Sequence, residues 1–334
     1  MKNKNHKPTT ILTITLVVIL TASIITACTR TDSKNKPMFV AITYNSNKAA
    51  YSYDGINWKA ATLPRSASWT NICYGNGKFV VVGNHNSKAA YSEDGINWAE
   101  TKIPGEEGSN IVCYGKGKFV TLGIGDRHSG INKAAYSMDG INWIETKMPE
   151  IAYLMSIAYG KGRFIAVNNG YDDEGSNKIA YSIDGINWNL ISIHTSATWN
   201  SVCYGNGKFV AVAGGFKSFT DKAIYSENGI HWTEATMPRE APWLSVCYGN
   251  GKFVAIIDEG DKAAYSKDGI KWVETPMPRK AFWLSVCHGN GKFVAIDRDS
   301  SEAAYSEDGI NWETTTLPKL PEKAYWFNIC YGGD

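Results

Sequence analysis

The chain has 334 residues, of which 43% are hydrophobic and 12% aromatic, and its formal net charge is +2 at pH 7. This length suits one or two domains, and the hydrophobic fraction is that of a folded protein rather than a disordered one. The 34 basic and 32 acidic residues nearly balance. The composition therefore lacks the basic excess of a nucleic-acid-binding protein, and we expect no nucleic-acid partner.

The N-terminal segment has the pattern of an export signal. Lys2, Lys4 and Lys7 precede an apolar stretch from Ile11 to Ala27, which gives a basic region followed by a hydrophobic one. The next residues, Ile25-Thr26-Ala27-Cys28, are similar to a bacterial lipobox. We therefore expect residues 1–27 to be a lipoprotein signal peptide and Cys28 to be lipidated. The alternative is an uncleaved signal anchor, since an apolar stretch of this length nearly spans a bilayer.

A short polar run follows Cys28 and ends at Pro37. It has no hydrophobic periodicity, so we expect residues 28–37 to be a flexible tether between the lipid and the folded part. These features place the protein on a membrane, outside the cytoplasm, at the cell surface or on the periplasmic side.

One short motif recurs along the rest of the chain. Its seven copies, spaced 40 to 45 residues apart, each run from an Asp or Asn through Gly to Trp and begin at Asp54, Asp94, Asp139, Asp184, Asn228, Asp268 and Asp308. Self-similarity at this period is typical of a repeat architecture in which all copies share one domain.

A second element lies between the copies, as in Ile72-Cys-Tyr-Gly-Asn-Gly-Lys-Phe-Val80. Its Gly-Asn-Gly centre tolerates the positive φ of a tight hairpin turn, and its flanks favour strands. The second strand, such as Phe209–Val212, is apolar at successive positions, so both of its faces should be buried. With two more strands around the Asp-Gly motif, each repeat has the four strands of a propeller blade.

The two ends of the repeat region complement each other. Met38–Ile42 matches the second strand with no first strand before it, and Trp326–Tyr331 matches a first strand with no second one after it. We therefore expect residues 38–334 to form an all-β, seven-bladed β-propeller of four-stranded antiparallel blades, closed by N- and C-terminal strands that share one blade. Such closure leaves no free sheet edge.

The Ser-x-Asp-Gly-x-x-Trp pattern resembles the Asp-box (BNR) repeats of sialidases and related propellers, although one residue is missing between Asp and Gly. The resemblance covers about residues 38–331 and implies that the Asp or Asn of each copy braces a turn. A sialidase would also need three arginines, a Tyr–Glu nucleophile pair and an acidic Asp on different blades. Arg65, Arg239 and Arg279 recur at one repeat position, whereas Asp258, Glu259 and Asp297 have no recognisable partner.

Other chemistry has weaker support. Six cysteines occupy one strand position, Cys73, Cys113, Cys203, Cys247, Cys287 and Cys330, with Ala158 in the seventh copy. Equivalent positions on neighbouring blades should be too far apart for disulfides, so we expect buried thiols. The histidines lack metal-ligand spacing, and we expect no metal site and no cofactor. The loop 168–177 has oxygen ligands for Ca²⁺, but a solvated acidic loop is the alternative.

Alternating strand direction puts the uniform Gly turns on one face of the ring and the variable loops on the other, where function is expected. Five of the 12 tryptophans stand four residues before the repeated Cys position, Trp69, Trp199, Trp243, Trp283 and Trp326. They are candidates, with Arg65, Arg239 and Arg279, for binding a glycan, peptide or protein. The alternative is that they pack loops against strands. We favour a monomeric, non-catalytic binding lipoprotein; a sialidase-like glycoside hydrolase and an assembly scaffold are the alternatives.

Overall fold

The computed structural model describes residues 36–84, 88–105, 109–123, 133–149, 153–170, 175–215 and 218–333. The chain divides into one unit of residues 1–33 and a second of residues 34–334. The expected signal peptide, Cys28, most of the tether and the acidic centre of the 168–177 loop lie outside the described residues. Within those residues every regular element is a strand, and no helix is long and apolar enough to cross a membrane.

The largest sheet has seven strands in the order β27-β1-β2-β3-β4-β5-β6. Its strands are β1 (Met38–Tyr44), β2 (Ser46–Ser52), β3 (Lys59–Gly75), β4 (Lys78–Asn84), β5 (Lys88–Ser92), β6 (Ala99–Lys102) and β27 (Tyr325–Gly332). The long strand β3 belongs to two ladders, because Lys59–Ala67 lies along β2 and Ser68–Gly75 along β4.

Five four-stranded antiparallel sheets account for the remaining strands. The first comprises β7 (Ser109–Gly115), β8 (Lys118–Gly123), β9 (Lys133–Ser137) and β10 (Trp143–Lys147), and the second β11 (Leu154–Gly160), β12 (Arg163–Asn168), β13 (Ser176–Ser182) and β14 (Asn189–Ala197). The third comprises β15 (Trp199–Gly205), β16 (Lys208–Ala213), β17 (Thr220–Ser226) and β18 (Thr233–Ala241). The last two comprise β19 (Trp243–Gly249), β20 (Lys252–Ile257), β21 (Gly260–Ser266) and β22 (Val273–Ala281), then β23 (Trp283–Gly289), β24 (Lys292–Asp297), β25 (Glu302–Ser306) and β26 (Glu313–Thr316).

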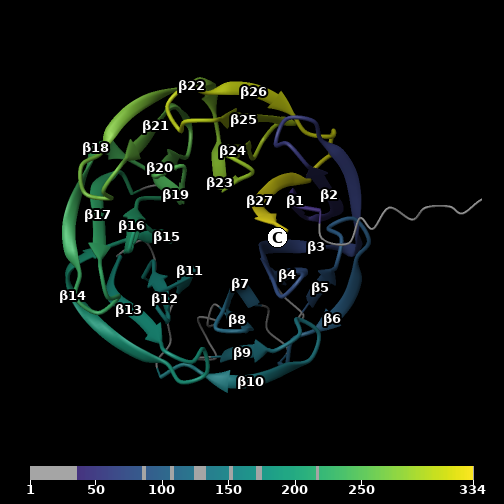
Figure 1. Ribbon diagram of the computed structural model, residues 1–334, viewed down its shortest axis with the longest axis horizontal. Helices are drawn as coiled ribbons and strands as arrows, with labels where there is room; N and C mark the ends of the chain where they lie inside the picture. The colour runs from purple at the N-terminus through teal and green to yellow at the C-terminus, as the bar shows by residue number, and fades with distance from the viewer. Residues whose placement is uncertain are drawn as a thin grey trace, which may run out of the picture. The chain divides into compact units, whose positions relative to one another are not determined.

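Within the unit from Lys36 onward, the sheets stand around a common centre (Figure 1). We call β27, the second half of β3, β7, β11, β15, β19 and β23 the inner strands. Each contacts the next, and β23 contacts β27, which returns the series to its start. The last strands of the sheets, such as β10, β14 and β18, lie on the circumference (Figure 1).

The expected pairing of the chain's first and last strands is confirmed. β27 runs antiparallel to β1, with Met38 opposite Gly332 and Tyr44 opposite Tyr325. The backbone N–H and C=O groups on this edge of β1 are therefore paired rather than exposed.

Packing between neighbouring sheets explains the continuous apolar runs. Phe209, Val210, Ala211 and Val212 of β16 are all 0% exposed, as expected for a strand covered on both faces. At the end of each inner strand a glycine lies directly against an aromatic ring of the next inner strand. At Gly160, for example, an added Cβ would lie 2.0 Å from Tyr204. The glycine thus allows adjacent inner strands to approach closely.

Two faces follow from strand direction. The turn face carries the two-residue turns after the inner strands, such as Asn76-Gly77, together with the Asp-Gly motifs. Hydrogen bonds join these two features between neighbouring sheets: Asn206 Nδ2 donates to Lys267 O at 3.4 Å, and Asn290 Nδ2 to Tyr53 O at 3.1 Å. The opposite face, where the inner strands begin, we call the cavity face.

Candidate functional site

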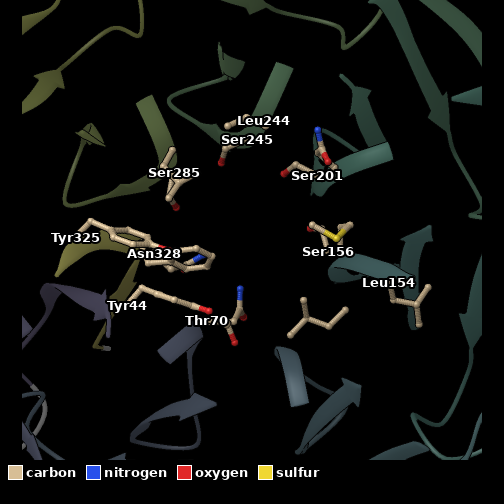
Figure 2. Close-up of a pocket in the computed structure, with 16 residues that line it drawn as sticks. Tyr44, Thr70, Leu154, Ser156, Ser201, Leu244, Ser245, Ser285, Tyr325 and Asn328 are labelled. Atoms are coloured by element: carbon tan, nitrogen blue, oxygen red, sulfur yellow. The ribbon is translucent and has the colours of Figure 1, made fainter. Parts of the chain in front are cut away.

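A central cavity of about 410 Å³ opens among the first residues of the inner strands (Figure 2). Two successive residues from most inner strands line it, for example Asn200-Ser201, Leu244-Ser245 and Leu284-Ser285. Tyr44, at the end of β1, joins them. The site is thus assembled from equivalent positions of many repeats, so each repeat contributes its own side chains to one wall.

A bulge near the start of most inner strands sets this arrangement. In β15, the strand register shifts between Trp199 and Ser201, and the same shift occurs between Trp243 and Ser245 and between Trp283 and Ser285. A bulge places two residues opposite one and re-aims side chains. Consequently the tryptophan points into the packing between sheets, while the two residues after it line the cavity.

Side chains of this wall also bind neighbouring inner strands. Asn71 Oδ1 accepts a hydrogen bond from Val112 N at 3.1 Å, and Ser201 Oγ accepts one from Val246 N at 3.1 Å. Ser156 and Ser245 accept equivalent bonds from Val202 N and Val286 N. A hydroxyl that accepts such a bond still has a proton to donate. The wall is therefore held in place and keeps donor capacity.

The cavity has an aromatic side and an aliphatic side. The rings of Tyr44 and Tyr325 stack with centroids 5.1 Å apart, and Phe327 lies 5.4 Å from Tyr44. These three side chains come from the pairing of β1 with β27. Leu154 lies across the cavity from them (Figure 2), and Met155 beside it is 39% exposed. A ligand in the cavity would contact both apolar walls.

The described lining carries no formal charge. It consists of Tyr, Phe, Leu, Ile, Met, Asn, Ser and Thr. Burial, together with the neighbouring Tyr44 hydroxyl, raises the pKa of Tyr325 from its ordinary value of 10.0. This phenol therefore stays protonated near neutral pH, and the wall offers hydrogen bonds and apolar surface rather than ion pairs.

The structure corrects the expectation for the five tryptophans. Trp69, Trp199, Trp243, Trp283 and Trp326 are each 0% exposed and pack between sheets. Where they donate hydrogen bonds, the acceptors are carbonyls of the fold: Trp199 Nε1 donates to Ser176 O at 2.9 Å and Trp283 Nε1 to Gly260 O at 3.1 Å. An indole with no exposed surface cannot contact a ligand. These residues therefore support the cavity wall from behind, as the packing alternative expected.

The three repeated arginines are not brought together either. Arg65 pairs with Glu100 of β6 at 2.7 Å, and Arg239 with Glu274 of β22 at 3.6 Å. Arg279 pairs with Asp297 and Glu302. Arg65 thus joins two strands of the seven-stranded sheet, whereas Arg239 and Arg279 each join their own sheet to the next one. None of the three lines the cavity. Their proposed contact with a ligand in the cavity is not supported by this placement.

The acidic candidates for hydrolysis lie outside the cavity lining. Asp297 is 2% exposed and is bound by Arg279 and by Ser300 Oγ, which donates at 2.7 Å. Burial raises the pKa of Asp258, although the Arg298 guanidinium 3.7 Å away opposes the shift. Glu259 pairs with Lys280 at 2.9 Å. Among the described residues, these carboxylates make ion pairs and do not face one another across the cavity.

The Asp-Gly motifs lie on the turn face and act within their own turns. Asp54 Oδ1 accepts hydrogen bonds from Ile56 N at 2.9 Å, Asn57 N at 2.7 Å and Ser52 Oγ at 2.9 Å. Partial burial acts to raise the pKa of Asp54, but bonds from Asn57, Ile56 and Ser52 outweigh it and hold the pKa below 3.8. Five equivalent positions behave alike: Asp94, Asp139, Asp184, Asp268 and Asp308. Asn228 makes the same backbone bonds without a charge.

The six described cysteines at the repeated position are free thiols. Burial raises the pKa of each, to about 12 for Cys113 and Cys330. Thiols with such pKa values are protonated and unreactive near neutral pH.

Sequence reasoning missed the aromatic wall. Its signal is the two aromatic residues around Trp326: Tyr325-Trp326-Phe327-Asn328 stands where two other copies, for example, have Pro-Trp-Leu-Ser and Thr-Trp-Asn-Ser. Tyr44 belongs to the first strand, opposite Tyr325. The contribution of both chain ends to one wall follows from the predicted closing pairing, whereas the roles of the residues that flank the tryptophans do not follow from the repeat pattern.

Comparisons with known proteins identify the fold but not a family. No protein-family model matches the chain, and no curated protein matches it in sequence. Among solved structures, virginiamycin B lyase from Staphylococcus aureus aligns with a TM-score of 0.65 and 16% identity over 79% of this chain and 92% of that chain. A catalytically inactive form of that lyase, solved with quinupristin, aligns with a TM-score of 0.65 and 14% identity over 86% and 97%.

A third structure, described as YCF48 bound to D1 peptide, aligns with a TM-score of 0.56 and 13% identity over 79% of this chain and 89% of that chain. At such identities structural similarity identifies architecture and leaves activity open. Together with the sheets around a common centre, these likenesses show that the chain has a β-propeller repeat fold.

Proposed function

We propose that the protein is a membrane-anchored lipoprotein outside the cytoplasm that binds a glycan, peptide or protein segment through its cavity face without converting it chemically. Binding would use the central cavity, and the bound part of the ligand would be uncharged. We also propose that the protein acts as a monomer, that residues 1–27 are removed as a signal peptide and that Cys28 carries the lipid.

The proposal includes seven blades. Two features favour seven blades over the six that a count of separate sheets would give. β3 is shared by two ladders, so the seven-stranded sheet divides naturally into two blades at Ala67/Ser68. Each contact between a glycine and an aromatic ring joins one inner strand to the next. The series has seven such contacts, beginning with Gly75 and Tyr114 and closing with Gly332 and Tyr74. We assign the Asp-Gly motifs to the Asp-box type because their carboxylates brace the turns.

The observation that carries the binding proposal is the neutral cavity with one aromatic and one aliphatic wall. Concave sites with apolar walls and a few fixed polar groups are typical of ligand-binding sites. Tyr44, Tyr325 and Phe327 offer ring faces on which a sugar or an aromatic side chain packs. The serines and asparagines of the opposing strands offer hydrogen bonds to hydroxyl or peptide groups.

Hydrolysis has less support as a function. A glycosidase needs two carboxyl groups at a set separation beside the substrate, and the described lining contains none. Two of the similar structures are described with a bound molecule, quinupristin in one and a peptide in the other.

Binding screens of the folded body, residues 36–334, against glycan arrays and peptide libraries test the proposal. For a ligand so found, we expect Phe327→Ala and Tyr325→Ala each to weaken affinity by roughly tenfold or more, since an aromatic contact in a pocket is a common hot spot. The matched control is Val273→Ala, on the outer strand β22 and 49% exposed, which should bind like the wild type.

Two results would contradict the proposal. Turnover of a sialoside or another glycoside by the body would replace binding with catalysis. A ligand whose affinity is the same for the wild type and for the Tyr325→Ala/Phe327→Ala double variant would place the site outside the cavity.

A further inference from the structure

In one sector of the turn face, the exposed side chains differ in kind from those of the other repeats. This sector contains the turns Lys116-Gly117 and Lys161-Gly162 and the Asp-Gly motifs after β9 and β13. In each motif we call the residue between Ser and Asp the tip residue. The tip residues in this sector are Met138 and Ile183, each 57% exposed. Elsewhere the tip residues are Tyr53, Glu93, Glu227, Lys267 and Glu307.

In two other repeats, a lysine on this face lies near the carboxylate of a tip residue. Lys208 lies 4.0 Å from the tip residue Glu227, and Lys292 lies 3.4 Å from the tip residue Glu307. The equivalents of these lysines in the sector are Lys118 and Arg163, whose repeats have Met138 and Ile183 instead of a carboxylate. Lys118 Nζ instead donates to the carbonyl of Asp184 at 2.9 Å. Exposed apolar tips thus coincide with cations whose repeats have no tip carboxylate. Outside the sector, the repeat of Lys252 also has none, because its tip residue is Lys267.

Two further lysines occupy positions that favour another residue. The first turn position has positive φ in every described copy, 49° at Lys116 and 47° at Lys161, and 44–46° at the four asparagines Asn76, Asn206, Asn250 and Asn290. Asparagine tolerates this conformation better than lysine does. The other described turns have asparagine at this position, whereas both turns of this sector have lysine. A departure from local backbone preference indicates a function, and we infer that the lysine charge supplies it.

The described chain begins on the same face. Met38 lies opposite Gly332, at the turn end of the inner strand, and Lys36 Nζ is 4.1 Å from the centre of the Tyr53 ring. Residues 28–37 are therefore joined to the fold at the turn face. A tether of this length spans at most roughly 35 Å when extended, so a lipid on Cys28 would keep the turn face close to its membrane.

We propose that the sector formed by Lys116, Lys118, Lys161, Arg163, Met138 and Ile183 rests on an anionic lipid surface. The apolar tips enter the headgroup region, and the cations lie against lipid phosphates, as in other interfacial contacts. The cavity face then points away from the membrane toward its ligand. The proposal rests on the membrane anchoring proposed above for its orientation, but the contact itself does not require the lipid on Cys28.

The test uses residues 36–334, because every described strand pairs within this part. Sedimentation with phosphatidylglycerol vesicles should show binding that weakens by roughly tenfold or more as salt rises and that is absent with phosphatidylcholine alone. The Lys116→Asn/Lys161→Asn variant should bind roughly 25-fold more weakly, at about fivefold for each lysine. Its melting temperature should stay the same or rise, because asparagine suits the turn.

The Met138→Ser/Ile183→Ser variant should lose roughly tenfold in vesicle binding. The matched control, Glu93→Ser/Glu227→Ser, changes tip residues of other repeats and should not weaken binding. Failure to bind phosphatidylglycerol at low salt, equal binding to phosphatidylcholine, or unchanged binding by the Lys116→Asn/Lys161→Asn variant would each overturn the proposal. Phe327→Ala, which tests the cavity, should leave vesicle binding unchanged, so failures of the two proposals are distinguishable.

Discussion

The turn face and the cavity face are opposite ends of the same strands, yet they use the repeat differently. On the turn face, the Asp-Gly turns make equivalent contacts in every repeat, and outside the sector of Lys116 and Lys161 asparagines such as Asn206 and Asn290 bond to the neighbouring motif. On the cavity face, the position after the tryptophan is Thr70, Asn200, Leu244, Leu284 or Phe327, and the same position in the copy with Leu154 is Met155. The repeat thus provides the frame where its copies agree and a site where they differ.

The position of the tryptophans sharpens this comparison. The tryptophan recurs in five of the seven copies, and Trp243 is wholly buried. The next residue, Leu244, occupies a position that varies between repeats and lines the cavity. The bulge between Trp243 and Ser245 therefore places a buried framework residue directly before a residue of the cavity wall. Substitutions at adjacent positions should therefore affect different properties.

The largest effect is expected from removal of the closing strand. Deletion of Tyr325–Asp334 exposes the edge of β1 and leaves the buried Phe39, Ala41 and Val294 without their neighbours Trp326 and Ile329. We expect the truncated protein to be unfolded at 25 °C, so that circular dichroism during heating shows no cooperative unfolding transition. If the truncated protein melted at the same temperature as the full-length protein, the stability of the fold would not depend on the pairing of β1 with β27.

A smaller but still large effect is expected for Trp243→Ala. Truncation of a fully buried tryptophan costs about 3–5 kcal/mol in the free energy of unfolding. Denaturant titration measures this loss, and Phe327→Ala, on the cavity wall, is the comparison. Phe327→Ala should lower the free energy of unfolding less than Trp243→Ala does, and it should lower ligand affinity more. If both substitutions lowered stability equally and neither changed binding, the separation of frame and site would be wrong.

The smallest effect concerns pH and the turn face. Because the pKa of Asp308 is lowered to about 2 from 3.8, its charge contributes stability above the unfolded pKa near 3.8, which is lost as pH falls through about 2. The free energy of unfolding should therefore decrease between pH 4 and pH 2. Asp308→Asn imitates Asn228, which keeps the backbone bonds without a charge.

The variant should be nearly as stable as the wild type at pH 2 and should lose less stability between pH 4 and pH 2. Thermal melts across this range measure the difference. An acid-induced loss as steep as that of the wild type would show that the charge of Asp308 contributes nothing to the turn.

Sequence reasoning was most successful where a local pattern determines local structure. Gly-Asn-Gly predicted tight turns, and the first turn residues have φ between 44° and 49°. Successive apolar residues predicted strands buried on both faces, as in Phe209–Val212. Even the long-range pairing of Met38–Tyr44 with Tyr325–Gly332 could be predicted, because each end lacks the strand that the other supplies.

The candidate site was predicted poorly because side-chain direction at a bulge cannot be derived from strand alternation. The tryptophans were expected at the cavity, but the shift between Trp243 and Ser245 turns the indole into the packing. The arginines share a repeat position, but their partners, Glu100 and Glu274, lie on the outer strands β6 and β22, which belong to other repeats. Such contacts depend on the spacing between neighbouring sheets, which the repeat alone does not give.

The pairing of β1 with β27 also has a kinetic consequence. When the chain emerges from its N-terminus, the first strand waits for a partner that is almost the last segment to appear, and contacts of such high sequence separation form slowly. Until Tyr325–Gly332 arrives, the edge of β1 is open to pairing with other chains, a common route to aggregation. The edge of β1 should therefore need protection from other chains until Tyr325–Gly332 has been synthesised.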